Sequence, residues 1–184
     1  LCQADAGIVT LGDRIDAETI HAATRLKILA NYAVGYNNID LAAAKRRGLI
    51  VTNTPDVLTD ATADLTWALL LATARRVVEG DALVRSGHWT GWSPTQLLGA
   101  EISGKTLGII GMGRIGQAVA RRAVGFRMPV LYHTRQAMAI SSLPREWEYR
   151  ALRELLEEAD LVTIHVPLTP ATHHLIGTCE LGWM

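Results

Sequence analysis

Short apolar runs alternate with segments of helical spacing along the whole chain. Aliphatic runs of strand length occur at 6–11, 26–30, 49–52, 107–110, 129–133 and 160–166. Stretches whose apolar residues recur every three or four positions lie between them, at 15–23, 40–47, 115–123 and 150–159. Such alternation with short connections is typical of parallel sheets covered by helices. We therefore predict an α/β protein whose ligands bind at the carboxyl ends of the strands.

One long helix is predicted in the middle of the chain. Thr59 or Asp60 can cap its start, and Ser86-Gly87 supplies a stop signal. Apolar residues cover more than one face of this helix. We therefore expect the helix to be buried on more than one side, between two parts of the protein and against a partner subunit. The irregular segment 88–98 carries two tryptophans, so it is interpreted either as an interface arm or as a loop folded back on its own domain.

A glycine-rich turn joins the strand at 107–110 to the next helix. Gly111, Gly113 and Gly116 form the pattern G-x-G-x-x-G. In a strand–turn–helix context, the first glycine allows the turn, the second admits a pyrophosphate to the backbone and the third lets helix and strand touch. Arg114 and Ile115 begin the helix, whose free N–H groups favour a phosphate. The turn therefore predicts dinucleotide binding, with a purely structural turn as the alternative.

The residues after the second strand of this unit indicate which dinucleotide is bound. No acidic residue occurs from Gln117 through Arg145, whereas an NAD site usually has a carboxylate there for the ribose 2′-OH. The strand instead runs into Thr134, Arg135 and Gln136, which suit a 2′-phosphate. We therefore predict NADP, with NAD possible. A solvated arginine is the alternative interpretation, but the missing acid also argues against an S-adenosylmethionine methyltransferase.

The loop after the third strand of this unit is expected to pass beside the cofactor. In a doubly wound sheet this position follows the strand next to the glycine turn, and here it begins with Pro167. Pro167 is therefore predicted to contact the cofactor.

Composition narrows the classes of function. The chain has 184 residues, with 18 basic and 18 acidic side chains and no formal net charge, which does not favour nucleic acid binding. The arginine pairs at 46–47, 75–76 and 121–122 are interpreted as solvated helix faces. Cys2 and Cys179 lack metal-like spacing, so we expect reduced thiols and no metal site.

The ends of the chain and its apolar runs bear on location. The run 65–74 is too short for a bilayer, and we find no charged-then-apolar leader. We therefore expect a cytoplasmic protein without a membrane partner. The sequence starts at Leu1 and stops at Met184, which suggests a fragment.

Four segments resemble the D-isomer-specific 2-hydroxyacid dehydrogenases, and most closely their glyoxylate and hydroxypyruvate reductase branch. These are NYAVGYNNID at 31–40, VTNTPDVLTDATADLTWALLLATARR at 51–76, GKTLGIIGMGRIGQAVARRA at 104–123 and ADLVTIHVPLTPATHHLI at 159–176. The resemblance implies a Rossmann nucleotide-binding domain plus part of a flavodoxin-like substrate domain. We expect residues 1–56 to be the partial substrate domain, 57–100 an interdomain helix and dimerisation arm, and 101–184 the partial Rossmann domain of a homodimer.

The resemblance also assigns residues. It implies that the N–H groups of Val34 and Gly35 hold the substrate carboxylate, as an anion nest would, and that Thr62 lies near the nicotinamide. It implies that the catalytic Arg, Glu and His lie beyond Met184, so no catalytic residue is expected in these 184 residues and the chain alone should be inactive. Where the family usually has Gly-Phe-Gly-Met, this chain has Arg127 at the third position.

Two function classes remain open on the sequence. The first is an enzyme that reduces glyoxylate or hydroxypyruvate with NADPH, or a family member with another substrate such as phosphite. The second is a non-enzymatic module that binds a nucleotide or dimerises.

Overall fold

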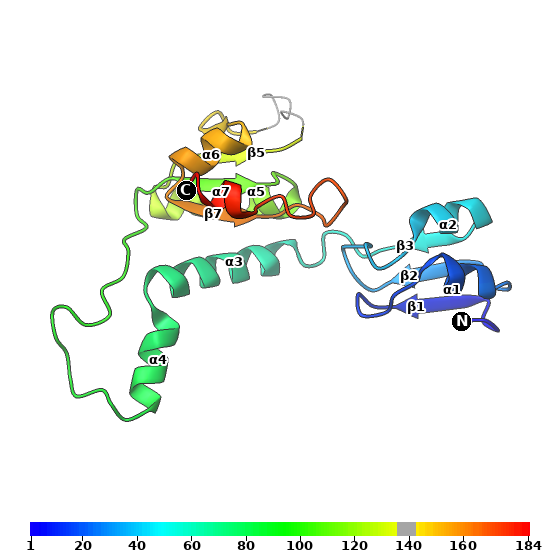
Figure 1. Cartoon of the computed structure of the whole chain (residues 1–184), viewed down its shortest axis with the longest axis horizontal. Coiled ribbons are helices and arrows are strands. Elements are labelled where there is room, and N and C mark those ends of the chain that lie inside the picture. The colour runs from blue at the N-terminus through cyan, green and yellow to red at the C-terminus, as the bar shows by residue number, and fades with distance from the viewer. Residues whose placement is uncertain (136–142) are drawn as a thin grey trace. The chain divides into compact units, whose positions relative to one another are not determined.

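The computed structural model describes residues 1–135 and 143–184, which form two compact units (Figure 1). The smaller unit contains Leu1–Leu58 and Pro167–His173, and the larger unit contains Thr59–Val166 and His174–Met184. The helices of the expected central segment 57–100 therefore belong to the larger unit. The division into functional domains stays a prediction.

The smaller unit is a three-stranded parallel sheet with two helices. Its elements are β1 (Ala6–Val9), α1 (Ala17–Ala22), β2 (Ile28–Asn31), α2 (Leu41–Arg47) and β3 (Ile50–Thr52), and the strand order is β1-β2-β3. The side chains of Asp16 and Asp40 accept the backbone N–H groups of Thr19 and Ala43 at 2.9 and 2.8 Å, which caps both helices. All five elements confirm the sequence prediction to within a few residues.

The larger unit contains a four-stranded parallel sheet with helices on both faces. Its elements are α3 (Thr59–Ala74), α4 (Val77–Arg85), β4 (Leu107–Ile110), α5 (Arg114–Ala123), the 3-10 turn η1 (Val124–Phe126), β5 (Val130–His133), β6 (Trp147–Tyr149), α6 (Leu152–Glu158), β7 (Leu161–Ile164) and α7 (Thr178–Leu181). The strand order is β6-β5-β4-β7. Leu107 and Ile109 of β4 pack on the side of α3 and α5, whereas Ile110 packs with residues of α6. This layered arrangement confirms the predicted Rossmann-type α/β class.

The predicted long helix is not continuous, while its expected burial between two parts of the protein and against a partner subunit stays a prediction. It is broken into α3 and α4 at Arg76, which has a left-handed φ of 52° and pairs with Glu79 at 2.6 Å. In α3 only Ala63 and Trp67 are buried, on the side that packs against α5, while Leu65 and Leu69 are about 60% exposed. Periodicity cannot reveal either feature, because the apolar residues of this helix do not gather on one face.

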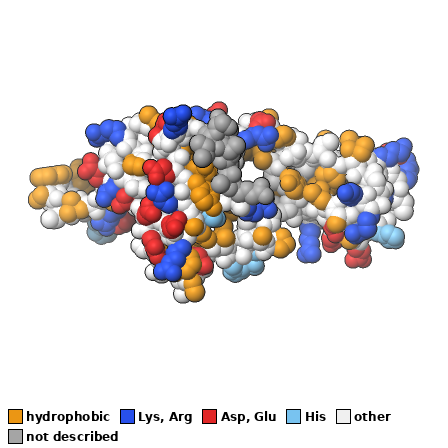
Figure 2. All heavy atoms as spheres, turned by 90° about the horizontal axis from the view of Figure 1, so that it is seen from above, with side chains coloured by type: hydrophobic (Ala, Val, Ile, Leu, Met, Phe, Trp, Pro, Cys, Tyr) orange, Lys and Arg blue, Asp and Glu red, His pale blue; other side chains and the backbone are white. Residues whose placement is uncertain are grey.

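The sequence analysis interpreted the arginine pairs as solvated helix faces. In two of the pairs, one arginine instead bonds groups of neighbouring elements. The guanidinium of Arg47 donates to the carbonyls of Ile20 and Leu26 at 2.6 and 2.9 Å. That of Arg122 bonds Asp64 and Asp60 at 2.8 and 3.1 Å and so ties α5 to α3. Arg47 and Arg122 therefore connect different elements of the fold. Figure 2 shows acidic and basic side chains interspersed over the visible face.

Two local features were not predicted. Strand β6, which pairs with β5, was not assigned to any element, and it is only three residues long. Arg127, which replaces the family's usual glycine, adopts a left-handed φ of 54° after η1. A glycine would reach this conformation without steric cost.

Candidate functional site

The glycine turn lies at the carboxyl end of the central strand β4. Gly111 has a φ of 101°, and a Cβ on it would lie 2.7 Å from the backbone of His165. A Cβ on Gly116 would lie 2.2 Å from the carbonyl oxygen of Gly111. Both glycines are therefore required by the fold of the turn itself.

Gly113 differs from its two neighbours. Its φ is −76°, which any residue can adopt, and no atom lies within 4 Å of the position that a Cβ would take. The helix α5 starts at Arg114 without a side-chain cap, so the N–H groups of its first turn are not satisfied by a capping side chain. A small residue beside open space and an uncapped helix start is what a bound diphosphate requires.

The predicted ribose-binding residues lie at the end of β5. Strand β5 pairs in parallel with β4, so both strands end at the same edge of the sheet. Thr134 is partly buried and Arg135 is exposed directly after the strand. Gln136 lies outside the described residues. The arrangement leaves the guanidinium of Arg135 in solvent at the edge that carries the glycine turn.

His165 follows β7 and contacts the glycine turn. Its backbone N–H donates to the carbonyl of Ile110 at 2.7 Å, and its imidazole Nε2 lies 3.0 Å from the hydroxyl of Thr163. Burial lowers the pKa of the His165 imidazole below its usual value, which favours the neutral form of the ring. A neutral, half-buried imidazole is a poor proton donor.

Thr62 and His165 line one groove of the larger unit. The groove has a volume of about 880 Å³ and runs between α3 and β7. Its walls are mainly apolar, with Thr62 and Thr66 on the α3 side. The hydroxyl of Thr66 donates to the carbonyl of Thr62 at 2.8 Å. The predicted nicotinamide-side residue Thr62 therefore lies in the same unit as the glycine turn.

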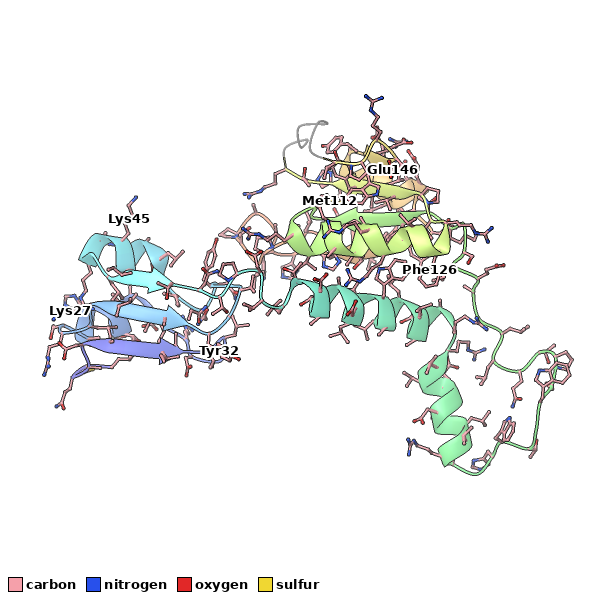
Figure 3. The ribbon with its side chains drawn as sticks, turned by 180° about the vertical axis from the view of Figure 1, so that it is seen from behind. Lys27, Tyr32, Lys45, Met112, Phe126 and Glu146 are labelled. Carbon is pink, nitrogen blue, oxygen red and sulfur yellow. The ribbon has the colours of Figure 1, made fainter. Side chains whose placement is uncertain are left out.

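The predicted carboxylate residues Val34 and Gly35 lie in the loop that leaves β2 in the smaller unit. Figure 3 labels Tyr32 near the start of this loop. Gly35 has no left-handed φ, and the nearest atoms to a Cβ on it would be side-chain atoms at 3.4 and 3.9 Å. The loop itself therefore does not require a glycine here. Pro167 also belongs to the smaller unit, and its carbonyl accepts the hydroxyl of Thr172.

The sequence analysis missed the side chains that hold this loop. Asn31 is 1% exposed, and it is the one buried polar side chain among residues 1–135 and 143–184. Its amide donates to the carbonyl of Gly35 at 2.7 Å, and that of Asn53 donates to the carbonyl of Val34 at 3.0 Å. For Asn31, the position of an asparagine at the end of an apolar strand could have indicated a buried, hydrogen-bonded side chain. Nothing local in the sequence distinguishes Asn53.

Two findings concern metals and membranes. In the described part of the chain, no three His, Cys, Asp or Glu side chains are grouped closely enough to hold a metal ion. The described helices also lack the combination of length and apolar character needed to cross a bilayer.

Known proteins resemble this chain over nearly its full length. Glyoxylate reductase from Thermococcus gammatolerans is 54% identical over 184 residues, covering 98% of this chain and 55% of that protein. The crystal structure of TT0316 protein from Thermus thermophilus superposes with a TM-score of 0.91 at 54% identity, covering 99% of this chain and 57% of the other. An acyclic imino acid reductase, Bsp5, in complex with NADPH and D-Arg superposes with a TM-score of 0.89 at 30% identity, covering 100% and 58%.

The chain thus spans somewhat more than half the length of these proteins. Residues 67–184 match the family described as D-isomer specific 2-hydroxyacid dehydrogenase, NAD binding domain. The matched range contains the glycine turn, the whole four-stranded sheet and His165. The chain belongs to the D-isomer specific 2-hydroxyacid dehydrogenase family.

Proposed function

We propose that the protein to which this chain belongs reduces glyoxylate or hydroxypyruvate to the corresponding 2-hydroxy acid and prefers NADPH over NADH. The observation that carries the proposal is the glycine turn, where Gly113 leaves open space beside an uncapped helix. Similarity to glyoxylate reductases supports the substrate class. The family is an NAD-binding one, and one similar structure holds NADPH.

In this proposal the larger unit holds the dinucleotide. The backbone of Gly111, Gly113 and Gly116 and the N–H groups of Arg114 and Ile115 would bind the pyrophosphate. Thr134, Arg135 and Gln136 would bind the ribose 2′-phosphate, because a guanidinium forms charge-assisted bonds to a phosphate and no carboxylate occurs between the end of β5 and Arg145 to repel it. Thr62 would lie near the nicotinamide. The contact of Pro167 with the cofactor stays a prediction, because Pro167 belongs to the smaller unit.

The smaller unit supplies the anion site. The N–H groups of Val34 and Gly35 would hold the carboxylate of the 2-oxo acid and thereby orient its carbonyl carbon. The bound nicotinamide would supply the hydride. We assign no proton donor to the described residues; in His165, burial lowers the pKa of the imidazole and so disfavours its protonated form. The catalytic Arg, Glu and His implied by the family resemblance stay a prediction.

An activity assay tests the proposal. A protein of the relatives' full length that contains this sequence is expected to oxidise NADPH when glyoxylate is added, and the 184-residue chain alone is expected to show no oxidation above a blank. The absorbance of reduced nicotinamide measures both. Hydroxypyruvate and phosphite, the latter with NADP⁺, are the comparison substrates. Turnover of phosphite alone, or sustained turnover by the 184-residue chain, would contradict the proposal.

A substitution at Gly113 tests the pyrophosphate site. Gly113→Ala is expected to weaken NADPH binding by about ten-fold, because the added methyl group occupies the space that a diphosphate needs. Its φ and its open surroundings predict an unchanged unfolding temperature. Gly125→Ala is the matched control, since nothing lies within 4 Å of its Cβ position either. Calorimetric titration with NADPH measures the effect, and equal affinities for Gly113→Ala and Gly125→Ala would count against the assignment.

A non-enzymatic nucleotide-binding or dimerisation module is the second candidate. The dimerisation part of this candidate is favoured by one observation: α4 has no buried residue, and its Val77, Val78 and Val84 are more than half exposed. The segment after α4 exposes Trp89 and Trp92 as well. We propose that these surfaces form a homodimer interface, in the enzyme or in such a module. Binding of NADPH without turnover by the full-length protein would favour the module.

The proposed partners and location follow from the same assignment. A small 2-oxo acid is the expected ligand besides the nucleotide, and neither nucleic acid nor a membrane is proposed as a partner. A neutral chain that uses a reduced nicotinamide fits a cytoplasmic protein.

A further inference from the structure

The loop after β2 is anchored by its carbonyl groups. The carbonyl of Ala33 accepts the backbone N–H of Thr54 at 2.9 Å. The next carbonyl, of Val34, accepts the side-chain amide of Asn53 at 3.0 Å, and the carbonyl of Gly35 accepts the side-chain amide of Asn31 at 2.7 Å. In three consecutive peptide groups, the carbonyl oxygen therefore accepts a hydrogen bond that fixes the group.

Anchoring a carbonyl also fixes the direction of an N–H group. A peptide group is planar and trans, so the C=O of one residue and the N–H of the next point in opposite directions. The anchors on Ala33, Val34 and Gly35 consequently orient the N–H groups of Val34, Gly35 and Tyr36 away from the anchoring atoms. In the ranges that the structure describes, none of these three N–H groups donates a hydrogen bond.

The buried asparagine is connected to the neighbouring loop through Asn38. Besides the bond to Gly35, the amide group of Asn31 lies 3.3–3.5 Å from that of Asn38. Asn38 donates to the carbonyls of Thr10 and Asp13 at 3.0 and 3.1 Å. The network thus connects the loops that follow β1 and β2. A buried amide with its hydrogen bonds made is rigid, whereas an unpaired one would be destabilising.

We infer that Asn31 and Asn53 are positioning residues, which hold the peptide groups of Val34 and Gly35 with their N–H groups free for a carboxylate. The inference rests on the proposed function, because it concerns the same anion site. In this inference, two side chains that do not touch the anion increase the affinity of the N–H groups for it. Preorganised N–H groups bind an anion more tightly because the loop loses no further conformational freedom on binding.

The test uses Asn53, which is exposed, because Asn31 is buried and its removal endangers folding. The ¹⁵N-labelled 184-residue chain is titrated with oxamate, a carboxylate analogue of glyoxylate, at constant ionic strength set with chloride. The amide resonances of Val34, Gly35 and Tyr36 are expected to shift in a saturable manner. Asn53→Ala is expected to weaken the oxamate affinity about five-fold, because the released peptide group must then be ordered when oxamate binds.

Matched variants separate positioning from structure. Thr52→Ala changes the preceding residue, which is also exposed and does not anchor a carbonyl of the loop, and this variant should bind oxamate as the unsubstituted chain does. Asn53→Gln retains an amide donor and should recover part of the affinity, whereas Asn53→Asp cannot donate and should bind more weakly than Asn53→Ala. NADPH binding and the unfolding temperature should stay unchanged in all four variants.

The outcomes distinguish the two proposals. If the unsubstituted chain shows no saturable shifts at these amides, both the carboxylate site of the proposed function and the positioning role are overturned. If the unsubstituted chain binds oxamate and Asn53→Ala binds it equally well, the positioning role alone is overturned. A loss for Asn53→Ala that Thr52→Ala shares would also overturn it, because the loss would then be a general effect of substitution at the end of β3.

Discussion

Gly116→Ala is expected to destabilise the larger unit by about 3 kcal/mol, the upper range for overpacking. The added Cβ would lie 2.2 Å from the carbonyl oxygen of Gly111 and 3.3 Å from a methyl group of Ile109. The first neighbour is backbone and cannot rotate away. Moving it requires α5 to separate from β4, and the same helix packs on α3 through Trp67, whose indole N–H donates to the carbonyl of Val119 at 3.1 Å.

Urea unfolding followed by far-ultraviolet circular dichroism measures this effect. Gly125→Ala is the control, because it makes the same chemical change in the same unit where a Cβ meets nothing within 4 Å. The control should unfold at nearly the urea concentration of the unsubstituted chain. A Gly116→Ala chain as stable as the control would mean that helix α5 and strand β4 do not approach as closely as described.

Arg135→Ala is expected to weaken NADPH binding about 10- to 100-fold, the range for losing hydrogen bonds to a charged group. The affinity for NADH should not change, since NADH lacks the 2′-phosphate. Arg135 is exposed at the end of β5, so its removal should leave the fold intact. Calorimetric titration of both reduced nucleotides gives the ratio of affinities.

The control for this prediction is Arg121→Ala. Arg121 is an exposed arginine of α5, so the variant loses the same charge from the same unit. An equal loss of NADPH affinity in both variants would indicate a general electrostatic effect. An equal loss of NADH and NADPH affinity in Arg135→Ala would remove the basis for the proposed NADP preference.

Most secondary structure could be predicted because its signals are local. Asp16 and Asp40 cap helices within three residues of their own positions, and Gly48 ends α2 with a left-handed φ of 70°. The turn with Gly111 and Gly116 was recognisable because backbone geometry restricts those positions to glycine. The family resemblance likewise depended on contiguous segments, and it led to the assignment of Val34 and Gly35.

The errors concern interactions between distant residues. Which face of α3 is buried depends on where α3 meets α5, which the period of a uniformly apolar helix does not encode. Arg122 was read as solvated because its partners, Asp60 and Asp64, lie about sixty residues away.

The sequence by itself determined the α/β class, the glycine turn and the lack of an acidic residue after β5, because each depends on residues that are close together in the chain. Only the tertiary structure decided which glycine of the turn has open space beside it and how the loop after β2 is held. Gly113 and Gly116 differ only in what surrounds a Cβ in space. The carbonyl anchors of Val34 and Gly35 come from the ends of two different strands, and only folding brings these ends together.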